Sequence, residues 1–193
     1  DEVIVTVTEN GATVTYDGNE HSVKGYKSMT ADNKLYDVTK SVKATETDAW
    51  TAKGKDAGEY PVGVAAGDFK NTNPNFTNVE FVIVDGKLTI SPITDKVTVT
   101  ITETNKTITY DGSEHSISGY TFIEADNRLY NLNKVAETRT DAWTAKGTDA
   151  GEYPVGIEAN DFKNNDANFT NVEFVIVDGK LTISPITDKT ITI

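Results

Sequence analysis

The sequence predicts a mostly β protein, with two tandem β-rich modules that are built from hairpins and arranged end to end as a rod. Three observations support this fold class. Apolar residues alternate with polar ones in several short runs, which is typical of half-buried strands. Asx-Gly pairs, which favour tight hairpin turns, separate these runs. The nineteen residues at 78–96 recur without a change at 171–189, and such a repeat is typical of an array of modules.

The repeat also gives the module boundaries. It predicts a first module at 1–94, a second at 95–188, and the start of a third repeat at 189–193. From residue 48 to residue 96, 42 of 49 positions are identical to their counterparts in the second module, which indicates recent duplication. Only a few residues around Pro92 join the modules, and a short link that contains proline is stiff.

The alignment of the two modules contains one gap. The offset between equivalent residues is 94 at Tyr16 and 93 at Trp50. The second module has therefore lost one residue between the positions that match Asp37 and Asp48. This loss predicts a loop in that segment.

The first module opens with alternating valines, which predict a strand. These are Val3, Val5 and Val7. Asn10-Gly11 follows, and this dipeptide favours the type I′ turn of a two-residue hairpin. The hairpin would place Val7 opposite Val14 on one apolar face.

A second hairpin is predicted at the end of the module. Asp85-Gly86 separates two apolar runs, and Asp-Gly readily adopts the positive φ values of a type I′ turn. The predicted register places Ile83 opposite Leu88. One face then carries the apolar side chains of the core: Val79, Phe81, Ile83, Leu88 and Ile90.

The middle of the module gives weaker signals. A turn at Tyr16-Asp17-Gly18 leads into a third short run at 21–26. In the segment 27–57, Leu35, Val38 and Val42 fit either a short helix or an irregular strand. Alternation returns at 58–64, where Pro61 requires an edge strand or a bulge because it donates no ladder hydrogen bond.

Composition narrows the classes of function. Eighteen basic and thirty acidic side chains give a net charge of −12, which repels phosphate backbones and anionic lipid, so neither nucleic acid nor a membrane surface is an expected partner. Cysteine is absent, so disulfides and thiolate sites are excluded. No apolar run approaches the roughly 18 residues of a membrane span, and no signal peptide precedes the first strand. We expect an internal fragment whose targeting signals lie elsewhere.

The order of motifs resembles the MBG/YDG-type repeats of large bacterial surface proteins and adhesins, which are mostly β and β-grasp-like. The motifs that carry the resemblance are Tyr16-Asp17-Gly18, Ala57-Gly58-Glu59-Tyr60, Asn75-Phe76 and Leu88-Thr89-Ile90, with their counterparts in the second module. The resemblance covers both modules nearly end to end. It implies an extracellular protein, anchored to the bacterial cell wall through regions outside this fragment, and it supplies no catalytic residues.

Trp50 and Trp143 are the first candidates for ligand binding. An exposed indole offers a flat apolar face on which a sugar can stack. The competing interpretation is a core tryptophan, which is the commoner environment for this residue. Exposure of both indoles would favour binding.

A metal site or a catalytic site is not expected. Asp17, Glu20 and His21 recur in the second module, but one histidine per module in a turn spacing favours a solvated turn. Ser22 follows His21 in an alternating strand, so the two side chains point to opposite faces and form no hydrolase triad.

The sequence gives little support for a Ca²⁺ site or an isopeptide bond. The Asn-rich segments 71–75 and 164–168 supply oxygen ligands for Ca²⁺, but they lack the spacing of a known calcium loop, so no cofactor is predicted. An isopeptide bond requires a buried lysine beside an Asn or Asp. Lys87 and Lys180 are predicted to face away from the core, which argues against this bond.

We therefore expect a non-enzymatic protein whose partners are neighbouring repeats of the same chain. Its expected function is that of stalk repeats which project a distal binding domain. The alternative is that the repeats are themselves weak, multivalent modules that bind host glycans or matrix proteins. An accessory module of a secreted polysaccharide-degrading enzyme is a third interpretation, which depends on what domain the full-length chain carries.

Overall fold

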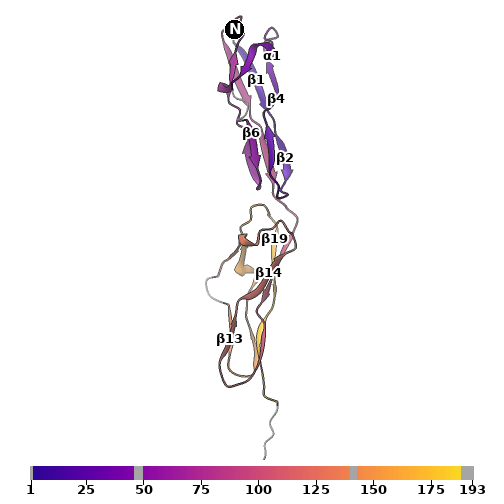
Figure 1. Cartoon of the computed structure of the whole chain (residues 1–193), viewed down its shortest axis with the longest axis vertical. Coiled ribbons are helices and arrows are strands. Elements are labelled where there is room, and N and C mark those ends of the chain that lie inside the picture. The colour runs from indigo at the N-terminus through magenta and orange to yellow at the C-terminus, as the bar shows by residue number, and fades with distance from the viewer. Residues whose placement is uncertain (1, 46–49, 140–142, 188–193) are drawn as a thin grey trace, which may run out of the picture. The chain divides into compact units, whose positions relative to one another are not determined.

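The computed structural model describes residues 2–45, 50–139 and 143–187 of the chain (Figure 1). The fold is mostly β, as the sequence predicts. The chain divides into two compact units, Asp1–Ile93 and Thr94–Ile193. The predicted start of a third repeat lies outside the described residues.

The elements of the first unit are short. In chain order they are β1 (Val3–Glu9), β2 (Ala12–Thr15), β3 (His21–Lys24), β4 (Tyr26–Ala31), α1 (Val38–Ser41), β5 (Val42–Ala44), β6 (Thr51–Gly54), β7 (Gly58–Pro61), the 3₁₀ turn η1 (Ala66–Asp68), β8 (Phe69–Asn71), β9 (Val79–Val84) and β10 (Lys87–Ser91).

The second unit has the same order of elements, except that its first helical turn is 3₁₀. They are β11 (Val97–Glu103), β12 (Lys106–Thr109), β13 (His115–Ser118), β14 (Tyr120–Ala125), η2 (Leu132–Lys134), β15 (Val135–Glu137), β16 (Thr144–Gly147), β17 (Gly151–Pro154), η3 (Ala159–Asp161), β18 (Phe162–Asn164), β19 (Val172–Val177) and β20 (Lys180–Ser184).

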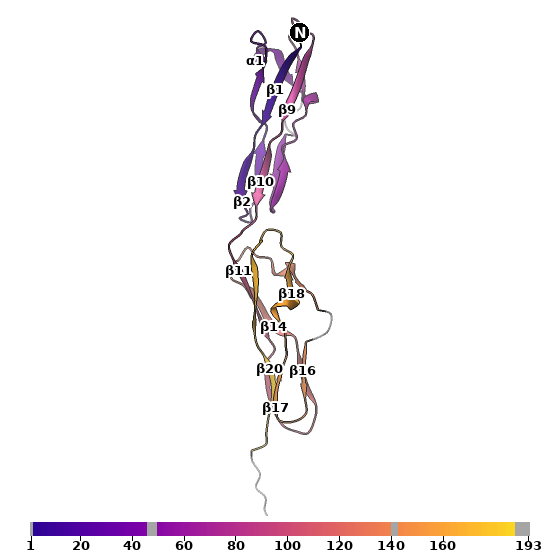
Figure 2. The same ribbon diagram turned by 180° about the vertical axis from the view of Figure 1, so that it is seen from behind.

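Two three-stranded sheets organise the first unit. In one sheet β1 lies in the middle, with β4 antiparallel on one side and β9 parallel on the other. In the other sheet β10 lies in the middle, with β2 parallel and β7 antiparallel. Figure 2 shows β1 beside β9 and β2 beside β10. The strand pairs β3–β6 and β5–β8 complete the described part of the unit.

The first and last segments of the unit run side by side in one constant register. Val3 pairs with Val79 in the first sheet, and Ala12 pairs with Leu88 in the second, so the partner lies 76 positions further along the chain in both sheets. The pairing is interrupted between the two sheets, after β1 in the first segment and after β9 in the last segment. In the second unit the same two segments pair with a constant separation of 75 positions, as between Val97 and Val172.

Both predicted hairpins are wrong, and with them the prediction that the modules are built from hairpins. β1 pairs with β4 and β9 rather than with β2, and β9 and β10 belong to different sheets. The positive-φ glycines of the first unit are Gly18, Gly25 and Gly63, so neither Gly11 nor Gly86 adopts a type I′ conformation.

Close backbone contact explains the glycine of Asp85-Gly86. A Cβ atom at Gly86 would lie 2.1 Å from the carbonyl oxygen of Asn10, closer than real Cβ contacts allow. The dipeptide therefore marks a place where two backbones touch, a second use of glycine that sequence alone does not separate from a turn. The long parallel pairing between distant segments then replaces the local hairpin.

The predicted apolar face is confirmed although its pairing is not. Leu88 and Ile90 are buried, and Phe81 and Ile83 are half-buried against the same core. The buried members of this core are Val7, Trp50, Ala52, Val62, Val64, Phe69, Leu88 and Ile90. A smaller core near the start of β1 contains Val3, Val5 and Tyr36.

The weakly predicted segment contains both a strand and a helical turn. β4 and β5 flank the four-residue helix α1, which Asp37 caps by accepting a hydrogen bond from the backbone N–H of Thr39. Leu35 lies outside both elements, before α1, and is 83% exposed. Pro61 lies in the edge strand β7, as its missing donor requires.

Helical segments are few and short in the described chain. None of them is long and apolar enough to cross a membrane.

Candidate functional site

The predicted ligand-binding tryptophans lie in the cores of their units. Trp50 is 4% exposed and Trp143 is 6% exposed. The Trp50 indole stacks on Phe69, with 5.3 Å between ring centroids, and Trp143 stacks on Phe162 in the same way. Neither indole presents a face on which a sugar could stack.

Each tryptophan also has its polar atom satisfied inside the unit. The Nε1 of Trp50 donates to Oδ2 of Asp68 at 2.7 Å, and the Nε1 of Trp143 donates to Oδ2 of Asp161 at 2.9 Å. The same Asp68 oxygen accepts from the backbone N–H of Ala65 and so fixes the turn η1. The indole is therefore a packing element that ties η1 to the core.

The predicted turn at His21 holds a histidine–aspartate pair. The Nε2 of His21 lies 2.9 Å from Oδ1 of Asp17. This hydrogen bond and those from the backbone and side-chain amides of Asn19 lower the pKa of Asp17 to about 2. Glu20 instead forms an ion pair with Lys53, at 2.9 Å. The three residues therefore do not converge on one point.

The second unit repeats this pair, with 2.9 Å between His115 Nε2 and Asp111 Oδ1. His115 is also the main cause of a lowered pKa at Asp111. Within residues 2–45, 50–139 and 143–187, no group of three or more His, Cys, Asp or Glu side chains is placed to hold a metal ion.

The Asn-rich segment uses its side chains within its own turn. Oδ1 of Asn71 accepts from the hydroxyl of Tyr36 and from the backbone N–H of Asn73, both at 2.9 Å. Nδ2 of Asn71 donates to the carbonyl of Phe76 at 2.6 Å. Oδ1 of Asn73 accepts from the backbone N–H of Asn75. These oxygens are already engaged as acceptors that shape the loop.

Lys87 faces away from the core, as predicted. Its side chain is 52% exposed and lies 2.5 Å from Oε1 of Glu59 on the neighbouring strand β7. Lys180 forms the equivalent pair with Glu152 at 2.6 Å. Neither lysine has the buried surroundings that an isopeptide bond requires.

A buried carboxylate that sequence reasoning missed lies at the break between the two sheets. Glu9 is 3% exposed. Its Oε1 accepts from the backbone N–H of Val64 at 2.5 Å, and its Oε2 accepts from the backbone N–H of Gly86 at 2.6 Å. We call this arrangement the carboxylate bridge.

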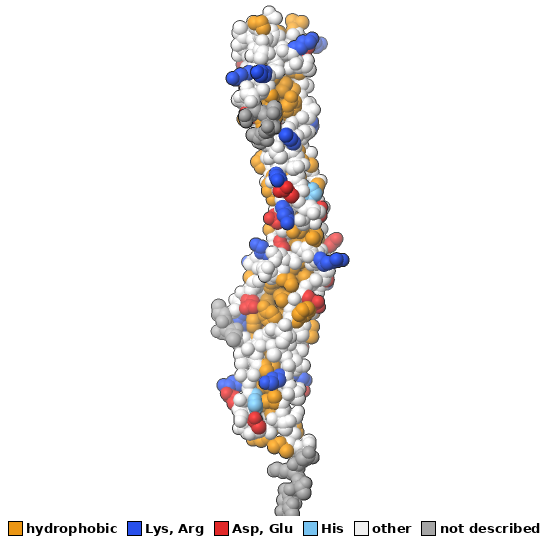
Figure 3. Space-filling model, in the orientation of Figure 1, with side chains coloured by type: hydrophobic (Ala, Val, Ile, Leu, Met, Phe, Trp, Pro, Cys, Tyr) orange, Lys and Arg blue, Asp and Glu red, His pale blue; other side chains and the backbone are white. Residues whose placement is uncertain are grey.

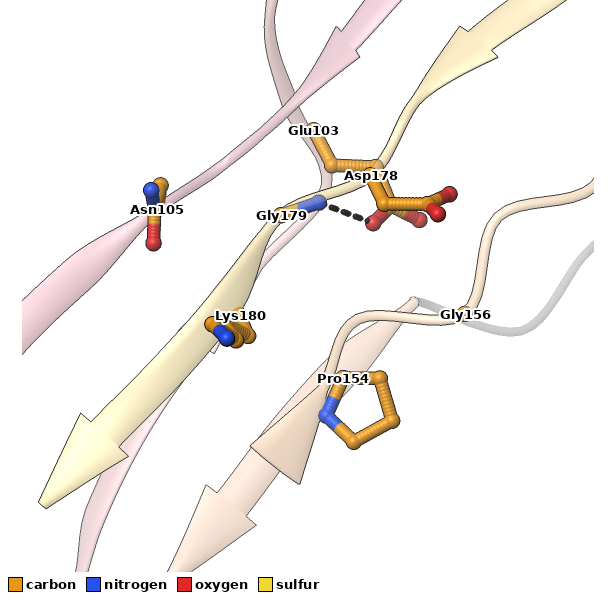
Figure 4. Close-up of a pocket in the computed structure, with 7 residues that line it drawn as sticks. All are labelled: Glu103, Asn105, Pro154, Gly156, Asp178, Gly179 and Lys180. Carbon is orange, nitrogen blue, oxygen red and sulfur yellow. Dashed lines mark hydrogen bonds between the residues drawn. The ribbon is translucent and has the colours of Figure 1, made fainter. Parts of the chain in front are cut away.

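The second unit has its own carboxylate bridge. Glu103 is also 3% exposed, and it accepts from Ile157 N–H at 2.5 Å and from Gly179 N–H at 2.6 Å. Figure 4 shows the bond from Gly179 to Glu103; both residues line a pocket whose other lining residues are Asn105, Pro154, Gly156, Asp178 and Lys180. The equivalent pocket of the first unit is lined by Glu9, Pro61, Gly63, Val64, Asp85, Gly86 and Lys87.

A sequence signal for the bridge exists. Val3, Val5 and Val7 point inward, and Glu9 continues the same alternation. Glu103 follows Val97, Val99 and Ile101 in the same way. A charged residue in register with an apolar face, at the same place in both repeats, predicts a buried and hydrogen-bonded carboxylate.

The charged side chains on one face of the described chain are of mixed sign (Figure 3). On the described part of the face drawn in Figure 3, acidic and basic side chains are interspersed rather than gathered into a patch of one sign. The exposed apolar side chains include Val82 and Val84 of β9, Val175 and Val177 of β19, and Phe122 of β14. The structure thus offers two repeated structural sites, the tryptophan core and the carboxylate bridge. No family model, curated protein or solved structure matches the chain.

Proposed function

We propose that the chain is a pair of force-bearing spacer repeats in the stalk of a bacterial cell-surface adhesin. Its motifs resemble those of MBG/YDG-type repeats, which supports tandem β-grasp-like modules, an extracellular location and anchoring to the cell wall through other regions. Its partners are then the neighbouring repeats of the same chain. The proposed function is mechanical and not enzymatic: the repeats hold a distal binding domain away from the cell.

The observation that carries this proposal is the parallel pairing of the first and last strands in each unit. In the first unit β1 pairs with β9 over six residue pairs, and β2 pairs with β10 over four. We call these two parallel pairings together the ladder. Because its two segments run in the same direction, a unit begins at one end of the ladder and finishes at the other (Figure 2).

Tension on such a unit loads the ladder in shear. The N-terminal load pulls β1 back towards its own start, while the C-terminal load pulls β10 forward past its own end. The two segments must slide past each other, so the interstrand hydrogen bonds of both sheets resist together. In a hairpin whose two ends lie at the same edge, tension would instead break one bond after another. The observed pairing is therefore suited to a segment under load.

The experiment is to stretch the chain by its two ends in an optical trap and record the unfolding of each unit. The chain has no cysteine, so an introduced cysteine gives a unique attachment point. In the control, Asn19→Cys and the C-terminal end carry the handles. The load then peels β2 from β10 in the first unit, while the second unit is still loaded in shear.

We expect the first unit to unfold at a clearly lower force in the Asn19 geometry than in the end-to-end geometry. The second unit serves as the internal reference, because its loading does not change. Equal unfolding forces of the first unit in both geometries would overturn the proposal.

The alternative is that the repeats bind host glycans or matrix proteins. Its two candidate ligand-binding residues are not exposed. Trp50 and Trp143 are buried and hydrogen-bonded inside their units. The binding alternative therefore no longer rests on these two residues, and the stalk is the function proposed.

A further inference from the structure

The ladder between first and last segments has a weak point in its middle. The pairing of β1 with β9 ends at Thr8 and Val84, and the pairing of β2 with β10 begins at Ala12 and Leu88. Between these positions the segments touch through bare backbone, because Gly86 lies directly against Asn10. The carboxylate bridge lies in this interruption.

The bridge connects three parts of the unit through one side chain. Glu9 is the last residue of β1, Gly86 lies between β9 and β10, and Val64 follows β7. The two oxygens bind two different backbone segments, so the carboxylate fastens the last segment to the first and also to the loop after β7. Hydrogen bonds to an ionised carboxylate are stronger than neutral ones, and burial keeps water from replacing them.

We propose that Glu9 and Glu103 bear mechanical load in their units. Each holds the ladder of its unit together where the backbone pairing is interrupted. This inference rests on the proposed force-bearing function and names the residues that carry the load. When the last segment starts to slide, the bond from Gly86 to Glu9 stretches at once with the flanking ladder. Without the bridge, the two halves of the ladder bear load separately and fail in sequence.

The second unit supports the same assignment with different neighbours. Glu103 meets Ile157 where Glu9 meets Val64, and Thr104-Asn105 replaces Asn10-Gly11, yet both bridging bonds are kept. A Cβ at Gly179 would meet the carbonyl oxygen of Thr104 at 2.4 Å, so the close backbone contact is kept as well. The bridge is therefore independent of the turn-like dipeptide beside it.

The test is a Glu9→Gln variant held at constant load between the two chain ends. The glutamine is isosteric, but its amide group has only one oxygen, so an NH₂ must face one of the two backbone N–H donors. We expect the lifetime of the first unit under load to fall about 10- to 100-fold, the equivalent of one lost charge-assisted bond. The second unit, which keeps Glu103, should be unchanged.

Three controls make the result specific. Glu59→Gln removes an exposed carboxylate that pairs with Lys87 on the outside of the ladder, and it should leave the lifetime unchanged. Glu103→Gln should transfer the effect to the second unit. In the Asn19 geometry, where β2 peels from β10 before the bridge is reached, Glu9→Gln should have no effect on the unfolding force.

An unchanged lifetime of the first unit in Glu9→Gln would overturn the inference, as would an equal effect in the shear and peeling geometries. If Glu9→Gln does not fold, the same measurements on Glu9→Asp test the inference instead. Aspartate keeps the charge but is one methylene too short to reach both backbone amides. Failure of the proposed function is recognised separately: with Glu9 intact, the first unit would then unfold at the same force in the end-to-end and the Asn19 geometries.

Discussion

The two units form the same helical turn in different ways, and the difference locates the missing residue. In the first unit α1 has four residues, ends at Ser41 and is capped by Asp37. In the second unit η2 has three residues, ends at Lys134 and is capped by Asn131. Ser41 is the residue that the second unit lacks, so the gap falls within a helical turn and not in a loop as predicted.

The contact made by the end of this turn survives the deletion. The backbone N–H of Thr72 donates to the carbonyl of Ser41 at 2.7 Å, and that of Asn165 donates to the carbonyl of Lys134 at 2.9 Å. A 3₁₀ turn advances further per residue than an α turn, so three residues replace four. The parallel ladder changes only in the separation of its partners, which shows that its pairing does not depend on this turn.

The polar partner beneath the turn changes together with its length. In the first unit Nδ2 of Asn73 donates to Oγ of Ser41 at 3.0 Å. In the second unit Asp166 occupies that position, and its Oδ2 accepts from the backbone N–H of Asn131 at 3.4 Å. Removal of the hydroxyl thus coincides with replacement of a donating amide by an accepting carboxylate, which leaves the site satisfied in both units.

The largest expected effect tests whether the ladder is equivalent in the two units. Gly86→Ala and Gly179→Ala each place a Cβ against a backbone carbonyl, so each should destabilise its own unit by about 3 kcal/mol. Chemical denaturation followed by fluorescence measures this, since each unit has one tryptophan. Gly67→Ala is the control, because nothing lies within 4 Å of a Cβ there. A large loss in only one unit would contradict the equivalence.

An intermediate effect is expected where the units differ. Asp166→Asn can turn a donating NH₂ towards the backbone N–H of Asn131, and we expect the free energy of unfolding of the second unit to fall by about 1 kcal/mol. The reverse change, Asn73→Asp, should cost less than about 0.5 kcal/mol, because the Ser41 hydroxyl can donate to a carboxylate. Equal losses of unfolding free energy in the two variants would show that the residue at position 73 or 166 is not matched to the helical turn above it.

The smallest effect concerns the caps. Oδ1 of Asp37 accepts from the side chain and backbone of Thr39, and Oδ2 pairs with Lys40; the Thr39 hydroxyl is the main reason that the pKa of Asp37 is lowered to about 2. A depressed folded-state pKa adds stability that is fully present above the unfolded pKa near 4 and is lost as the pH falls towards 2.

The matching measurement compares Asp37→Asn with the unmodified chain across this pH range. The difference in stability of the first unit should shrink as the pH falls from about 4 to about 2, while the second unit, already capped by Asn131, shows no difference. Asp17 titrates in the same range but is present in both chains, so its contribution cancels. A stability difference that is independent of pH would contradict this role of the cap.

The sequence predicts which side chains face inward better than it predicts which strands pair. The alternation in β1 and around Leu88 gives the buried faces correctly, since each side chain's direction depends only on local backbone geometry. Pairing depends on partners 75 or 76 positions away, and no local pattern specifies them. Asp85-Gly86 therefore predicts a hairpin although its glycine serves a backbone contact.

The same limit applies to the candidate site. Trp50 and Trp143 are visible as unusual residues, but a sequence does not show whether an indole lies inside or outside a small core. Glu9 is one of thirty acidic residues, and only its position in the alternation of Val3, Val5 and Val7 marks it as inward-facing.

The central position of β10 has a consequence for biosynthesis. β10 lies between β2 and β7, so those two strands have no link within their sheet until residues 87–91 have been made. β1 likewise waits for β9. Each unit can complete its fold only when its final segment is available, because contacts between distant residues form late and slowly. A growing chain therefore leaves a unit incompletely folded until its last segment has been made, and folding follows one repeat at a time.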